Sequence, residues 1–410
     1  MNESDGTNGL TPMRRRRTAI GPLAGTVLVA AGLAAVWRTS DLGRASSDLD
    51  RQWAAAKAEG VPTEYADLHR LTPPVPEARN AAPAYGDAFA TFHKFGALKG
   101  VDTKALLKAI PAGSAKPEDL TKLRLALRDA SPALAQAREG SRRPEFSLNQ
   151  RWELGSALTF PQYSDARSVA TALSLRAMLA NDPAAAVDDL RTAARMRAHF
   201  GADPVIIASL VGNGIEAIVH TATRFAGAKG PAWAAALAPV MGDLGPIPAL
   251  RRSLTGEVVW GMHFDEEIAR SGVSGISGMD GSSPPLPMRL MAFGPVRDAS
   301  KDRVVEYWRR AWARLPQDPT DFRAAREALR LPSNAGPSYA MLDFLLPVFE
   351  GFTEVNTRSE ADRRFTRMAL AIDAGRTPAP ERDPFGGGPM KVRHEARGWT
   401  LWSVGPDGVD

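Results

Sequence analysis

The chain contains no cysteine, and this absence removes several classes of chemistry. Without a thiol there can be no disulfide framework, no thiolate metal site and no cysteine nucleophile. Also missing are the serine-hydrolase elbow G-x-S-x-G, the S-x-x-K pair, and a glycine loop that leads into a helix with lysine. The sequence therefore predicts no catalytic residues and no cofactor.

The folded part of the chain also lacks a large net charge, because much of the positive charge lies near the N-terminus. The formal net charge is +5, but residues 1–40 hold five arginines against Glu3 and Asp5, which is +3 and leaves +2 for the rest. A folded portion so nearly neutral does not favour a nucleic-acid partner. The 44% hydrophobic and 24% charged residues are ordinary for a globular protein, so most of the chain should fold.

Residues 18–37 carry no charge over twenty positions, which predicts a transmembrane helix. At 1.5 Å per residue they span about 30 Å, the thickness of the bilayer hydrocarbon. Residues 14–17 are all arginine, and such a cluster beside the first span stays in the cytoplasm. We therefore expect a single-pass protein of a bacterial inner membrane, with a cytoplasmic basic N-terminus over 1–17 and its C-terminal bulk on the periplasmic or outer side. A cleaved signal peptide is the alternative, although its apolar region is usually only 7–15 residues long.

Strand signals are nearly absent before residue 380, so the exported part should be mainly α-helical. A juxtamembrane helix and a proline-rich linker are expected over 43–78, and a helical domain over 79–272. A Gly/Ser/Pro-rich loop over 273–297 then precedes a second helical group over 298–375, in which Pro347 should kink a long helix without ending it. The predicted helices are 43–59, 81–98, 102–109, 117–139, 164–180, 184–200, 204–228, 231–241, 246–272, 298–314, 318–330 and 337–375.

Two of these helices, 164–180 and 184–200, resemble one tetratricopeptide-type helical hairpin. Arrays of that type need about three units to bury a continuous core, and no second copy is recognisable. An ordinary antiparallel pair inside a helical domain is the preferred interpretation.

The last residues change character. Met390, Val392 and His394 alternate with charged residues, and a turn near Gly398 precedes a second short run, which predicts a β-hairpin over 390–404. The tail 383–410 resembles the C-terminal hairpin of the major pseudopilins of type II secretion, which carry a DP-aromatic-G-x-P turn, two strands and an S-x-G-x-D-G loop. The matching residues are Asp383, Pro384, Phe385, Gly386, Pro389, Leu401, Trp402, Ser403, Gly405, Asp407 and Gly408.

The rest of the chain departs from a pseudopilin, because the apolar segment lacks the processing site and the exported region is too long. The whole chain is more similar to a group of uncharacterised, membrane-anchored bacterial proteins that combine an NAAPxY segment, helical hairpins, an LLP helix and this tail. No activity is established for that group, so the resemblance implies architecture only. The residues that carry it are Asn80, Ala81, Ala82, Pro83, Tyr85, Leu345, Leu346 and Pro347.

Metal binding has two weak candidates. The pseudopilin resemblance implies calcium at Asp407 and Asp410, but calcium takes six to eight oxygens and a plain surface turn is the preferred interpretation. The second candidate is a carboxylate and imidazole cluster on two helices, with His220 four residues after Glu216 and His263 before Glu266 and Glu267. The Glu-x-x-His pairs of di-metal helical proteins are missing, so no metal site is predicted.

Three functional hypotheses remain open. The first is a non-enzymatic interaction or scaffold protein with a protein partner in the cell envelope, for which the tail suggests a secretion or pilus-like assembly. The second is a membrane-anchored hydrolase whose metal site would join Glu216, His220, Glu257, His263 and Glu267. The third is a structural envelope protein without a specific ligand.

Overall fold

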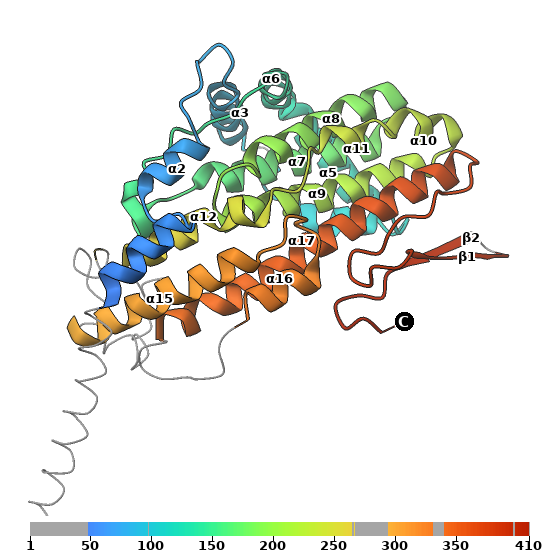
Figure 1. The fold of residues 1–410 in the computed structure, drawn as a ribbon. Helices are drawn as coiled ribbons and strands as arrows, with labels where there is room; N and C mark the ends of the chain where they lie inside the picture. Colours follow the sequence, from blue (N-terminus) through green and yellow to red (C-terminus); the bar gives the residue numbers. More distant parts are fainter. Residues whose placement is uncertain are drawn as a thin grey trace, which may run out of the picture.

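The computed structural model describes residues 48–96, 98–264, 266, 294–330, 340–396 and 398–409. These residues form a mainly helical body and one two-stranded antiparallel sheet near the C-terminus (Figure 1). The expected mainly helical fold and the expected hairpin are thereby confirmed. The predictions for 1–17, 18–37 and 273–293 fall outside the described residues.

Residues 48–58 are helical and are followed by α2 (Tyr65–Leu71), α3 (Ala82–Lys94), α4 (Thr103–Ala109), α5 (Pro117–Asp129), α6 (Ser131–Ser141) and the 3-10 helix η1 (Trp152–Ala157). Then come α7 (Pro161–Leu179), α8 (Pro183–Phe200), α9 (Ile206–Gly227), α10 (Pro231–Leu237), α11 (Val240–Asp243), α12 (Leu250–Met262), α15 (Gly294–Arg314), α16 (Phe322–Ala328) and α17 (Ala340–Asp373). The strands are β1 (Lys391–Glu395) and β2 (Gly398–Trp402). The longest helices of the body are α7, α8, α9, α15 and α17.

The main core lies where α7, α8 and α9 pack on one another. Small residues allow these helices to approach closely. At Gly212 in α9, for example, an added Cβ would lie 3.1 Å from the Cα of Gly201 after α8, which leaves little room for a larger side chain. Within the described part of the chain, only α9 is long and apolar enough to cross a membrane, and 67% of its apolar window is buried by the other helices.

The 34-residue α17 joins the parts of the body. It lies along α9 on one side, and near its other end Phe349 packs on Trp308 of α15 with ring centroids 5.2 Å apart (Figure 1). Trp308 and Phe349 belong to a second apolar cluster between α12, α15 and α17. Pro347 lies inside α17, so it does not end the helix, as the sequence predicted.

Several predicted boundaries were wrong, mostly at prolines. The helix expected over 117–139 is two helices, α5 and α6, because Pro132 lacks an amide hydrogen and its ring clashes with the preceding turn. The helix expected over 231–241 is divided between α10 and α11 near Pro239, and the one expected from 246 begins only at Leu250. α2 was missed inside the predicted linker, and α15 begins at Gly294, inside the predicted loop.

Candidate functional site in the C-terminal tail

The tail begins with a tight turn that is organised by the carboxylate of Asp383. This side chain is buried and accepts hydrogen bonds from the Phe385 amide at 2.9 Å, the Ser403 hydroxyl at 2.8 Å and the Val404 amide at 2.8 Å. Burial alone would raise the pKa of Asp383, but these hydrogen bonds more than offset it and hold the pKa below its ordinary value. One carboxylate thus ties the entry of the hairpin to its exit.

Steric contact explains why a glycine, Gly386, follows Phe385. A Cβ at Gly386 would lie 2.8 Å from Cγ2 of Val404, so the two ends of the hairpin can meet only if this position has no side chain. Asp383, Phe385, Gly386 and Ser403 are among the residues that carry the pseudopilin resemblance, and here they form one connected turn.

The tail is docked on α16 and α17 by an ion pair, by a hydrogen bond from Arg364 to the Arg382 carbonyl, and by an apolar cluster. Arg367 of α17 donates two hydrogen bonds to Glu381, at 2.8 and 3.0 Å. Phe385 packs edge to face on Phe322 of α16, with centroids 5.3 Å apart. Met390 belongs to the same buried cluster. The turn is therefore fixed to the helical body.

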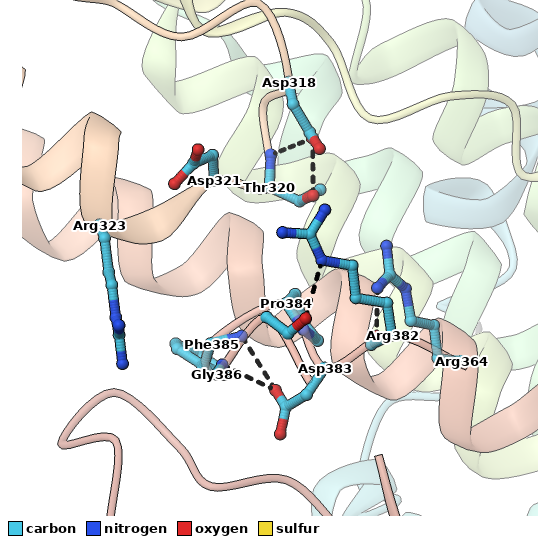
Figure 2. A pocket seen from close by; sticks show the side chains of 11 residues that line it. Asp318, Thr320, Asp321, Arg323, Arg364, Arg382, Asp383, Pro384, Phe385 and Gly386 are labelled. Atoms are coloured by element: carbon cyan, nitrogen blue, oxygen red, sulfur yellow. Dashed lines mark hydrogen bonds between the residues drawn. The ribbon is translucent and has the colours of Figure 1, made fainter. Parts of the chain in front are cut away.

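A cavity of about 250 Å³ lies beside this turn (Figure 2). Its polar lining is balanced in charge, with Arg323, Arg364 and Arg382 opposed by Asp318, Asp321 and Asp383. Most of these groups have partners: Asp318 accepts from the amide and hydroxyl of Thr320, and Arg382 donates to the Gly387 carbonyl at 3.2 Å. We interpret this cavity as the joint between tail and body, because its charges are largely used within the joint.

The hairpin itself extends away from the helices (Figure 1). Val392 pairs with Leu401 and His394 pairs with Trp399, so these four side chains share one face of the sheet. Leu401 packs on the cluster at the base, but Val392 is 38% and Trp399 40% exposed. The opposite face carries Lys391, Arg393, Glu395, Thr400 and Trp402.

Asp407 lies beyond the hairpin, next to a basic hollow. It accepts a hydrogen bond from the Val409 amide at 3.3 Å. The hollow is also lined by Arg323, Arg326 and Glu327 of α16 and by Arg330 just after that helix. Nearby guanidinium groups disfavour a divalent cation. The second calcium candidate, Asp410, is outside the described residues.

Glu216 and His220 lie together, as their spacing suggested, but deep inside the body. Both are fully buried in α9, with Nε2 of His220 3.2 Å from Glu216. Glu216 also pairs with two buried arginines that no sequence pattern indicated. Arg197 of α8 lies 2.6 Å from it, and Arg363 of α17 donates to both of its oxygens, at 2.9 and 3.0 Å. We call these four residues the ionic core.

The remaining members of the proposed metal cluster lie elsewhere. Glu257 of α12 accepts the Ile206 amide at 2.8 Å, at the start of α9. His263 lies within hydrogen-bond distance of the Thr63 carbonyl and of Glu266, and it stacks on Tyr65. No group of three His, Asp or Glu residues among the described ones could hold a metal ion, and Glu267 is outside them.

Glu257 should make stability depend on pH. Burial raises its pKa to about 8, since the single amide of Ile206 does not compensate for lost hydration. The folded state therefore keeps a proton that the unfolded state loses near pH 4.5, so stability falls as pH rises between these values. We expect Glu257→Gln, which keeps the acceptor oxygen, to unfold with less pH dependence, and to exceed the parent protein by a few kcal/mol near pH 9. Denaturant unfolding of both proteins near pH 5 and pH 9 measures this difference; equal pH dependence would contradict it.

The NAAPxY segment proves to be structural. The Asn80 side chain donates to the Ser147 carbonyl and accepts the Ser147 amide, so it joins the start of α3 to the chain after α6. The Tyr85 hydroxyl lies 2.9 Å from Nδ1 of His199 at the end of α8, and its ring packs on Phe200. These contacts position the helices around α3 and α8.

Comparisons with protein-family models, with curated proteins and with solved structures gave no match to this chain.

Proposed function

We propose that this protein is a membrane-anchored interaction protein, exported to the outer side of a bacterial inner membrane, that binds a protein partner through the hairpin β1–β2. The observation that carries this proposal is the exposed apolar face around Val392 and Trp399 on a hairpin whose base is fixed by Asp383. Residues 18–37 would supply the anchor, and the tail's resemblance to pseudopilins suggests a partner in a secretion or pilus-like assembly.

The hairpin has the properties of a docking element. A two-stranded sheet is marginally stable alone, and here neither outer edge is paired with another described strand. Unpaired edges present backbone donors and acceptors that a partner strand can use, while side-chain pockets give specificity. A partner strand beside β1 or β2 could cover Trp399 and complete the sheet.

The helical body supports a binding role in another way. Four of its buried ionisable groups are engaged with one another in the ionic core, and the contacts that the hydrolase hypothesis needs are not formed among the described residues. The body instead holds the base of the tail in place through the ion pair between Arg367 and Glu381.

The test is crosslinking in intact cells, followed by purification of the tagged full-length protein in mild detergent and mass spectrometry. We expect a specific set of envelope proteins that is lost on deletion of residues 383–410. We further expect the double variant Val392→Ser, Trp399→Ser to reduce recovery of those proteins about tenfold or more, because it removes the exposed apolar face while leaving the base intact.

A matched control is the double variant Arg393→Ala, Thr400→Ala, which changes the opposite face of the same strands. It should retain the partners. Equal loss with both variants would indicate a general effect on the hairpin, and partners retained after deletion of the tail would refute this proposal.

A further inference from the structure

A second surface, remote from the tail, has the character of a binding groove. It is a cavity of about 670 Å³ between α5, α6 and the α7–α8 pair, a volume in the range of ligand pockets. Four arginines line it, Arg124, Arg128, Arg138 and Arg176, against two aspartates, Asp182 and Asp189, so the lining has a net charge of +2.

Two of these arginines are held in place by a buried carboxylate. Arg176 donates two hydrogen bonds to Asp189, at 2.8 and 2.5 Å, and Arg138 donates a third at 3.1 Å. The Asp189 side chain is 4% exposed, whereas those of Arg138 and Arg176 are 31% and 28% exposed. One carboxylate therefore orients two guanidinium groups at the wall of the groove. Arg138 has a second, longer ion pair with the exposed Asp188, at 3.6 Å.

The other two arginines stand on α5 at the rim. Arg124 forms no ion pair within the described part of the chain, and Arg128 has only a 3.4 Å contact with its neighbour Asp129. Exposed pairs of this kind are weak, so both guanidinium groups are available to a ligand.

The helix ends around the groove also favour an anion. The last carbonyls of α7 would repel negative charge, but the amine of Lys229 donates to those of Met178 and Ala180, at 2.9 and 2.8 Å. The positive end of the 18-residue α8 begins at the groove, where Asp182 caps only the Ala185 amide.

The floor of the groove is apolar, with Leu127 and Leu179 beside alanines of α6 and α8. A small anion would meet the arginines and leave this floor in contact with water. A segment with both carboxylates and aliphatic side chains would satisfy both parts of the lining.

We infer that this groove binds an acidic peptide segment of a partner protein, with carboxylates on Arg124, Arg128, Arg138 and Arg176 and an aliphatic side chain on Leu127 and Leu179. The site is separate from the hairpin, so it provides a second point of attachment that does not depend on the function proposed for the tail.

The experiment is fluorescence anisotropy with the full-length protein in a nonionic detergent. The probes are three short fluorescein-labelled peptides of equal length, one of glutamate and leucine, one with glutamine in place of glutamate, and one with lysine. We expect the glutamate peptide alone to bind, with an affinity that falls as salt is raised.

The double variant Arg124→Ala, Arg128→Ala should weaken that binding about tenfold, since it removes two rim charges without touching the buried Asp189. Arg124→Lys, Arg128→Lys should retain most of it. The control is Arg51→Ala, Arg358→Ala, which removes the same charge from exposed positions that do not line the groove and should leave binding unchanged. The hairpin variant Val392→Ser, Trp399→Ser should also bind normally.

Three results would overturn the inference: equal binding of the glutamine peptide, an equal loss in the control variant, or competition by free glutarate at the same concentration as the peptide. The last result would indicate a site for small anions only.

Discussion

Glu216→Gln is expected to lower the free energy of unfolding by about 3–5 kcal/mol, because it breaks a buried network of charges by removing one partner. The carboxylate of Glu216 neutralises Arg197 and Arg363, which are both buried. Glutamine fills the same space but leaves two guanidinium groups without a counter-charge in a region of low polarity. Denaturant unfolding followed by circular dichroism measures the change.

The stabilisation that Glu216 provides should also depend on pH. Burial alone would raise the pKa of Glu216, but Arg197, His220 and Arg363 more than offset it and hold the pKa at about 2. The stabilisation is therefore complete above about pH 4.5, the value in the unfolded chain, and is lost as pH falls towards 2. The variant should lack this acid transition.

Glu139→Gln is the matched control, because Glu139 is 63% exposed and its one ion pair among the described residues is with Arg142, at 3.4 Å. It should change stability by no more than about 0.5 kcal/mol. A loss of under about 1 kcal/mol in Glu216→Gln would mean that the ionic core does not hold α8, α9 and α17 together.

Asp383→Ala is expected to release the tail while leaving the helical body folded. The substitution removes the common acceptor of the Phe385 and Val404 amides and the Ser403 hydroxyl, so those donors would be buried without partners unless the turn opens to water. Opening should speed hydrogen exchange of the Phe385 and Val404 amides by at least about tenfold. Recovery of envelope partners should fall together with that protection.

Asp407→Asn provides the comparison for this prediction. Asp407 is another aspartate of the tail and belongs to the same pseudopilin-like pattern, but among the described residues its one hydrogen-bond donor is the Val409 amide, at 3.3 Å. Exchange in the turn should not change in this variant. Unchanged protection in Asp383→Ala would show that the ion pair and the apolar cluster hold the turn without this carboxylate.

Local patterns in the sequence predicted most of the fold, because helices and hairpins are encoded over short distances. Alternation around Val392 and His394 indicated the strands, and the helix predicted over 184–200 is α8, which begins one residue earlier. The break between α5 and α6 could have been predicted from Pro132, because a proline inside a helix removes a backbone hydrogen bond.

The ionic core could be predicted only in part. Glu216 and His220 are one helical turn apart, so their contact follows from spacing. The contact of Glu216 with Arg363 joins residues 147 positions apart, and no pattern within one helix encodes such a pairing. The spacing of Glu216 and His220 suggested a metal site. Glu216 instead forms ion pairs with arginines of other helices, and these depend on tertiary structure.

The length of α17 has a mechanical consequence. Its 34 residues make a rod of about 51 Å, and the tail is attached near its C-terminal end through Arg367. Arg363, farther along the rod, binds Glu216 of α9, which also pairs with Arg197 of α8, and α15 lies against the other end. A partner bound to the hairpin would thus act on one end of a helix that several other helices hold along its length, so force on the tail would be shared by the whole body and not by the turn alone.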